Sequence, residues 1–126
     1  MPRISDFLEQ KYKERYGGED CSEIAEQLVR FLGNGEVIHF MPQSSADKVL
    51  LQRLTVNDFY KLAGGQEFKL EAGRGETFLY HSVYYDRKSR KIIDYYTCKA
   101  CSISDYLNYL TKINGVDIPF SFVQNF

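Results

Sequence analysis

The chain has 126 residues, 44% of them hydrophobic, which is long enough to bury a core and short enough to form one domain over residues 1–126. Its 16 basic and 17 acidic residues are interleaved and leave a net charge of −1, so the sequence lacks the positive face that nucleic-acid binding needs. No apolar run approaches the roughly 18 residues of a membrane-spanning helix, and the charged N-terminal segment lacks the apolar core of a secretory signal peptide. We therefore expect no nucleic-acid or membrane partner, and a protein that is cytoplasmic or is delivered to a target-cell cytoplasm as part of an exported protein.

The first third of the chain predicts two helices. Apolar residues at helical spacing cover residues 6–16, and the glycines that follow should end this helix. A second amphipathic helix covers residues 21–32. Asp20 and Glu23 have the D-x-x-E spacing of a capping box, which fixes the start of this second helix, and Gly33 should end it.

The rest of the chain predicts mainly strands. Period-two alternation bounded by turn residues predicts five strands, at residues 36–40, 67–72, 76–85, 90–97 and 116–122. Short helices are predicted at residues 46–54 and after Thr55, and a longer one after Ser102. Because Pro119 cannot donate a ladder hydrogen bond, the last strand should lie at a sheet edge. Helices followed by a mostly antiparallel sheet indicate an α+β fold.

Cys21 is the first residue of the second predicted helix, where backbone N–H groups have no helical acceptor. The helix dipole favours a thiolate at such a position, and the N–H of Cys21 or Ser22 could donate to an oxyanion formed on an attacked carbonyl. The alternative is a small buried residue below Ile24 and Ala25, because free cysteines often fill cores. The position alone does not separate a nucleophile from a core residue.

His81 and Asp94 supply the base and the acid that a thiol nucleophile needs. They lie in two aromatic-rich strands joined by the polar segment D-R-K-S-R-K, which predicts a hairpin. If the loop has two or four residues, Val83 lies opposite Asp94, and His81 is a diagonal neighbour of Asp94 on the same face. A three-residue loop without a bulge would put Asp94 on the other face. The sequence therefore predicts a Cys21–His81–Asp94 triad, in that order along the chain.

His39 and the C-x-x-C pair of Cys98 and Cys101 are the other candidates for chemistry. His39 ranks second as a base, because no acid follows it at hairpin spacing. The cysteine pair is half of a zinc site, and no second pair completes it. It precedes a predicted helix, as in thioredoxin-like redox sites, but without their βαβ pattern. We favour a structural role for the pair, with redox and metal roles as alternatives, and expect no cofactor or metal for the triad.

The order and local context of the triad resemble the papain-like fold, and most closely the papain-fold toxin domains of bacterial polymorphic toxins. The segments D-C-S-E-I-A-E-Q-L-V-R-F-L, Y-H-S-V-Y-Y-D and K-I-I-D-Y-Y carry the resemblance, which covers residues 17–97. The middle of the chain, residues 40–75, adds nothing to it. The resemblance implies a papain-like cysteine enzyme that acts on amide or carboxamide groups of proteins or peptides, as a protease, deamidase or transglutaminase-like enzyme. It also implies an immunity protein as partner.

The source of the oxyanion donor departs from this family. Papain proteases carry a glutamine about six residues before the cysteine, whereas this chain has Arg15 there. Tyr16, or a backbone amide such as that of Ser22, would have to serve instead. Tyr80, Tyr84 and Tyr96 bracket the triad, either as walls of a substrate cleft or, as for most aromatic residues of the chain, as core and sheet packing.

Two alternatives stay open. The segments E-D-C-S-E-I-A and H-S-V-Y-Y-D-R-K-S-R-K-I-I-D also resemble NlpC/P60 cell-wall peptidases. The chain departs from those enzymes because their G-D-L-type strand before the histidine is missing and because Asp94 stands where they usually have a histidine. A non-catalytic immunity or interaction protein with a buried Cys21 is the alternative from a different functional class.

Overall fold

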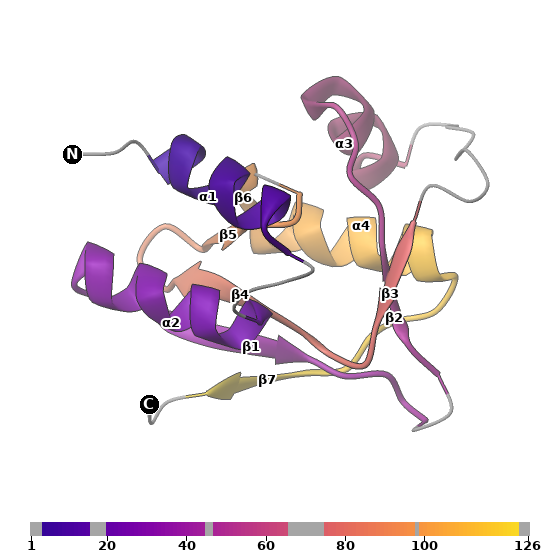
Figure 1. Cartoon of the computed structure of the whole chain (residues 1–126). Coiled ribbons are helices and arrows are strands. Elements are labelled where there is room, and N and C mark those ends of the chain that lie inside the picture. Colours follow the sequence, from indigo (N-terminus) through magenta and orange to yellow (C-terminus); the bar gives the residue numbers. More distant parts are fainter. Residues whose placement is uncertain (1–3, 16–19, 45–46, 66–74, 98, 124–126) are drawn as a thin grey trace.

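The computed structural model describes residues 4–15, 20–44, 47–65, 75–97 and 99–123, which form an α+β fold (Figure 1). Its elements are, in chain order, α1 (Ile4–Lys13), α2 (Cys21–Leu32), β1 (Glu36–Phe40), β2 (Val49–Leu51), α3 (Val56–Ala63), β3 (Glu76–Phe78), β4 (His81–Asp86), β5 (Lys91–Asp94), β6 (Lys99–Ser102), α4 (Ile103–Asn114) and β7 (Phe120–Val123). Within these ranges, an antiparallel sheet has the strand order β6-β5-β4-β1-β7, and β2 pairs with β3 in a second, antiparallel ribbon. The predicted α+β class is confirmed. No helix in the described part of the chain is long and apolar enough to cross a membrane.

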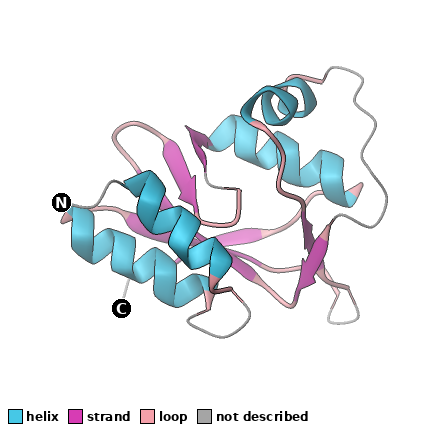
Figure 2. Cartoon of the chain, turned by 45° about the horizontal axis from the view of Figure 1, so that its top comes forward, coloured by secondary structure: helices cyan, strands magenta, loops and turns pink. Residues whose placement is uncertain are grey.

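Helices cover both faces of the five-stranded sheet. Phe40 of β1 points toward α4, where its ring centroid lies 5.6 Å from that of Tyr106. Tyr84 of β4 points to the opposite face, and its hydroxyl donates to Asn34, which follows α2. Figure 2 shows the same arrangement, with α1 and α2 on one side of the strands and α3 and α4 on the other. The position of a residue in its strand therefore decides which helices its side chain meets.

Helix α2 begins and ends where the sequence predicts. The carboxylate of Asp20 accepts a hydrogen bond from the backbone N–H of Glu23 at 2.9 Å, and Gly33 ends the helix. The chain then enters β1 through Gly35, whose φ is 112° and where a Cβ would lie 2.2 Å from a tyrosine ring of β4. Only glycine allows this close approach. It holds α2 against the sheet and so fixes where its first residue, Cys21, meets β4.

Strands β4 and β5 form the predicted hairpin, and its register is the one that the triad requires. Asp86 pairs with Lys91, which leaves a four-residue loop between them. In the same register, Val83 faces Asp94. An even-numbered loop keeps the side chains of His81 and Asp94 on one face of the sheet, here the face toward α4.

Two predicted segments are wrong. Residues 46–54, expected to be helical, contain the strand β2. A continuous apolar run fits either structure, and pairing with β3 buries both Val49 and Leu51. The single strand expected at residues 76–85 is divided into β3 and β4, because these pair in different sheets and the chain turns at Leu79, which is 69% exposed.

The other boundaries lie within a few residues of their predictions. The helix expected at residues 6–16 corresponds to α1. The predicted caps Thr55 and Ser102 each accept a hydrogen bond from the backbone N–H three residues further on. The C-terminal strand begins directly after Pro119 and lies at the sheet edge. The strand expected at residues 67–72 lies outside the described residues.

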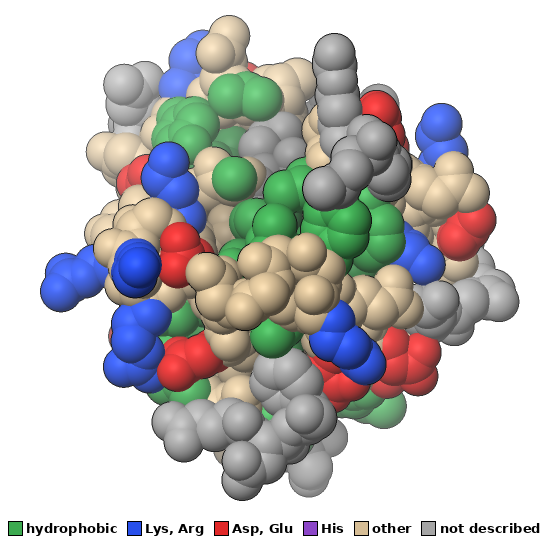
Figure 3. Space-filling view, turned by 90° about the vertical axis from the view of Figure 1, so that its left-hand side faces the viewer, with side chains coloured by type: hydrophobic (Ala, Val, Ile, Leu, Met, Phe, Trp, Pro, Cys, Tyr) green, Lys and Arg blue, Asp and Glu red, His purple; other side chains and the backbone are tan. Residues whose placement is uncertain are grey.

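Hydrophobic side chains gather in patches on the end of the molecule that Figure 3 shows. Ile4, Phe7, Leu28 and Phe31 line an apolar groove between α1 and α2. Since Cys21 lies at the other end of α2, this groove is no part of the site described next.

Candidate active site

The structure brings the three predicted triad residues together at the start of β4. Cys21 is the first residue of α2, His81 the first of β4 and Asp94 the last of β5. The side chains of His81 and Asp94 are fully buried, and Cys21 is 6% exposed. One helix N-terminus and the ends of two neighbouring strands therefore meet at one point.

The sulfur of Cys21 lies against the backbone of β4. The backbone N–H of Ser82 donates to Sγ at 3.3 Å, and the thiol points to the carbonyl oxygen of Tyr80 at 3.9 Å. Strand β5 pairs with β4 only from Tyr84 onward, so it does not compete for the backbone of Ser82. The sulfur therefore has polar backbone groups of the chain around the start of β4 as neighbours.

The carboxylate of Asp94 holds the imidazole of His81 and is itself held by two further donors. Nε2 of His81 lies 2.9 Å from Oδ1 of Asp94. Oδ1 also accepts a hydrogen bond from the backbone N–H of Tyr96 at 3.0 Å, and Oδ2 accepts one from the hydroxyl of Tyr106 at 2.8 Å. Three donors from three parts of the chain thus fix the carboxylate, and through it the plane of the imidazole.

The two buried groups favour each other's charged form. Burial by itself lowers the pKa of His81, but the charge and hydrogen bond of Asp94, and then the nearby Cys21 sulfur, raise it to about 10. Burial by itself raises the pKa of Asp94, but the charge of His81 and the three hydrogen bonds lower it. The pair is therefore imidazolium and carboxylate at neutral pH.

The second ring nitrogen of His81, Nδ1, is the one that can exchange a proton with the thiol. It is buried, and no described residue lies in hydrogen-bonding geometry to it, although the Cys21 sulfur is close enough to raise the pKa of the ring. A buried polar atom without a partner lowers stability, so its presence calls for an explanation. Nε2 is bound to Asp94, and the Cys21 sulfur is close enough to raise the pKa of the ring. Nδ1 is therefore the ring nitrogen that is available to the Cys21 thiol.

Aromatic rings enclose the imidazole. The ring centroids of Phe78 and Tyr95 lie 5.9 Å and 6.0 Å from that of His81. These rings keep water away from the hydrogen bond between His81 and Asp94, which strengthens that bond because the local dielectric constant is low.

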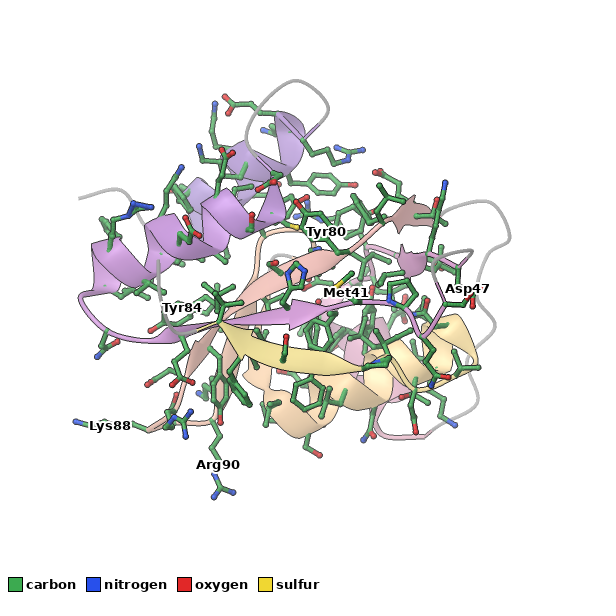
Figure 4. All side chains as sticks on the ribbon, turned by 90° about the horizontal axis from the view of Figure 1, so that it is seen from below. Met41, Asp47, Tyr80, Tyr84, Lys88 and Arg90 are labelled. Carbon is green, nitrogen blue, oxygen red and sulfur yellow. The ribbon has the colours of Figure 1, made fainter. Side chains whose placement is uncertain are left out.

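The residues expected to line the site lie in different places. The Ser22 hydroxyl donates to Asp20 at 2.7 Å and so takes part in the helix cap. The hydroxyl of Tyr80, the residue before β4, also donates to Asp20, at 2.7 Å, so Tyr80 reaches the N-terminus of α2 (Figure 4). Tyr84 lies further along β4, near the other end of α2, and the expectation that it lines the cleft is wrong. Tyr16 lies outside the described residues.

Tyr106 and Ser82 contact the triad, and the sequence did not single them out. The order of the chain gives no sign of which of its ten tyrosines meets Asp94, although Tyr106 follows the Ser102 cap by one helical turn. Ser82 could have been found from strand alternation, because it is next to His81 and its side chain must point to the opposite face.

His39, the second-ranked histidine, is also close to the site. It lies directly opposite Ser82 in the register of β1 and β4, and its Nδ1 is 2.8 Å from the Ser82 Oγ. Its ring centroid is 4.8 Å from that of Tyr80. His39 has no contact with Asp94 and so does not replace His81 in the triad.

The C-x-x-C pair cannot be described as a pair, because Cys98 lies outside the described residues. Cys101 is buried in β6 opposite Ile92. Within the described ranges, no group of three or more histidine, cysteine, aspartate or glutamate side chains could hold a metal ion.

Comparison with known proteins gives no match to a family model, to a curated protein or to a solved structure. The likeness to papain-like enzymes therefore stays a prediction that rests on the sequence segments around Cys21, His81 and Asp94.

We predict that Asp94→Asn lowers the free energy of unfolding by roughly 3 kcal/mol near pH 6, because it removes one partner of a buried ion pair. The loss should depend on pH. Because the pKa of His81 is raised, the contribution of His81 to the free energy of unfolding is complete below pH 6.5, the ordinary pKa of histidine. This contribution is lost as the pH rises through about 10. Because the pKa of Asp94 is lowered, the contribution of Asp94 to the free energy of unfolding is complete above pH 3.8, the ordinary pKa of aspartate. This contribution is lost only in stronger acid. Urea unfolding of wild type and variant from about pH 5 to about pH 10 measures the difference.

The matched control is Asp47→Asn, which changes an exposed carboxylate and should cost little at any of these pH values. An Asp94→Asn effect that is the same at every pH would show that His81 and Asp94 do not form a charged pair.

Proposed function

We propose that the protein is a cysteine enzyme that transfers acyl groups from amide or carboxamide substrates. Cys21 is the nucleophile, His81 acts first as base and then as acid, and Asp94 orients His81. One observation supports this above all others. A fully buried imidazole has a carboxylate on Nε2, a thiol that acts on the ring and, among the residues that the structure describes, no other partner for Nδ1.

The chemistry proceeds in two halves. His81 holds the proton that Cys21 gives up, so the imidazolium is already present when the deprotonated sulfur attacks the carbonyl carbon, an S–C bond forms and the carbonyl oxygen becomes an oxyanion. His81 then returns the proton to the leaving nitrogen as the C–N bond breaks, which leaves a thioester. In the second half, His81 removes a proton from water or an amine, which attacks the thioester and releases Cys21.

The backbone N–H of Cys21 is the first donor for the oxyanion. It lies in the first turn of α2, and no described residue accepts a hydrogen bond from it. The helix dipole adds positive potential at the same point.

The main competing explanation is that Cys21 only fills the core, and its low exposure agrees with that. Cys21 does belong to the core cluster that includes Ile24 and Leu28. Its sulfur also accepts an N–H and lies beside a buried ion pair, which a residue that only fills the core does not need. Burying such a pair only for packing would lower stability relative to hydrophobic residues of the same size.

The resemblance to papain-fold toxin domains extends the proposal to the biological setting. It suggests a bacterial toxin or effector whose substrate is a protein or peptide and whose partner is an immunity protein. An NlpC/P60-type enzyme would instead release stem peptides from purified peptidoglycan, which separates the two kinds of cysteine enzyme.

We predict that p-nitrophenyl acetate acetylates Cys21 in a burst of p-nitrophenolate with one equivalent per active protein. Peptide mass should place the acetyl group on Cys21, and Cys21→Ser should abolish the burst. His81→Ala should slow it by about 10²-fold or more, because the base is lost. Cys101→Ser is the matched control, since Cys101 is a second buried cysteine, opposite Ile92 in β6, and it should keep the burst.

An acetyl group distributed over several side chains, or a burst that does not depend on His81, would contradict the proposed function. Circular dichroism of each variant shows whether a lost burst reflects chemistry or unfolding.

We further predict that Tyr106→Phe slows the acetylation of Cys21 several-fold, because Asp94 loses one of the donors that hold it and His81 is less well oriented. Tyr109→Phe is the control. Tyr109 is buried on the same helix, and its hydroxyl bonds to the backbone of Gln52 instead of to the triad. Each variant should lose about 1–2 kcal/mol of unfolding free energy, but only Tyr106→Phe should change the burst rate. Equal burst rates in the two variants would show that Tyr106 has no positioning role.

A further inference from the structure

His39 lies on the same side of the sheet as the N-terminal half of α2, next to the residue that touches the nucleophile. It faces Ser82 across β1 and β4, and the backbone N–H of that same Ser82 donates to the Cys21 sulfur. Tyr80 packs against the His39 ring and reaches Asp20 with its hydroxyl. His39 therefore stands in the shell of residues around the thiol, on the side of Ser82 and away from Asp94.

The hydrogen bond to Ser82 determines where the proton of His39 is. Ser82 is 1% exposed, and among the described residues its hydroxyl has Nδ1 of His39 as its one acceptor, at 2.8 Å. A buried hydroxyl proton without an acceptor is costly, so the hydroxyl donates and Nδ1 accepts. An imidazole that accepts on Nδ1 is neutral and carries its proton on Nε2.

The electrostatics of the site agree with a neutral ring. Burial lowers the pKa of His39, and the positive charge of His81 lowers it further, against a smaller opposite effect of Asp20. Two histidines in one site thus have opposite roles: His81 is charged and His39 is neutral at pH 7.

The Nε2–H of His39 is a donor without an assigned acceptor. The side chain is partly exposed, and no described residue accepts a hydrogen bond from Nε2. The Tyr80 ring and the Ser82 hydroxyl fix the plane of the imidazole, so the N–H has a set direction and little freedom to lose. Preorganised donors of this kind are what stabilises an oxyanion.

We propose that the Nε2–H of His39 is the side-chain donor to the oxyanion that forms when Cys21 attacks a carbonyl. This rests on the proposed function, which supplies the attack. As the S–C bond forms, the electron pair of the C=O bond moves to oxygen, where the N–H groups of Cys21 and His39 receive the negative charge. When the C=O bond re-forms, the C–N bond breaks and His81 donates its proton to the leaving nitrogen. His39 gives up no proton in either step.

Two reactions of the same thiol test this role. Alkylation by iodoacetamide uses the sulfur but forms no oxyanion, whereas acetylation by p-nitrophenyl acetate forms one. His39→Ala should slow acetylation by about 10²-fold and change alkylation by about twofold at most, because one oxyanion donor is lost and the nucleophile is kept. His39→Gln, whose amide N–H lies near the position of Nε2–H, should recover about tenfold of that loss. Tyr84→Phe is the control on the same face of β4, at the far end of α2, and should change neither rate.

The outcomes separate this proposal from the proposed function. Equal loss of both reactions in His39→Ala, or no loss of acetylation, overturns the role of His39 while the triad stands. No recovery in His39→Gln, when circular dichroism shows it folded, also overturns it. A wild type whose acetylation requires neither Cys21 nor His81 overturns the proposed function, and the role of His39 with it.

Discussion

The buried ion pair of His81 and Asp94 is the constraint on which the rest of the structure depends. Removing two charges from water costs several kcal/mol per ion, so such a pair persists only when its remaining polar atoms have partners. Asp94 meets that condition through the Tyr96 backbone and the Tyr106 hydroxyl. Because these donors come from the chain after β5 and from α4, the pair ties the hairpin to the helix behind it.

The site is assembled from both layers that cover the sheet. Helix α4 reaches the triad from one face through Tyr106, and α2 reaches it from the other through Cys21. They meet where β4 begins and β5 ends. At this point the backbone N–H of Ser82 has no partner in β5 and donates to the Cys21 sulfur instead. Cys21 can therefore reach the backbone of β4 without displacing a strand of the sheet. The order of Cys21, His81 and Asp94 along the chain is the order of α2, β4 and β5.

The sequence predicts best what depends on near neighbours in the chain. The helix caps at Asp20, Thr55 and Ser102 need only a residue three positions away, and all three are confirmed. The hairpin register follows from the parity of a short loop, so the proximity of His81 and Asp94 could be predicted before the structure was known. Each of these features is local.

What the sequence misses depends on distant partners. Strand β2 exists because β3 pairs with it, and β3 lies 25 or more residues further along the chain. Tyr106 reaches Asp94 only because α4 packs on the sheet, and no spacing rule selects it. The place of His39 beside Ser82 required the pairing of β1 with β4, which hydropathy alone does not give.

The site depends on a His81 imidazolium held between Asp94 and the Cys21 sulfur. Because the chain has only two histidines, ¹⁵N-histidine labelling and NMR give a direct reading of both rings, with His39→Gln for assignment. We expect His81 to be protonated on both nitrogens at neutral pH and to lose a proton only near pH 10, and at lower pH in Cys21→Ser, while His39 is neutral with its proton on Nε2. A His81 ring that is neutral at pH 7, or that titrates identically in wild type and Cys21→Ser, would contradict the charged pair and its contact with Cys21.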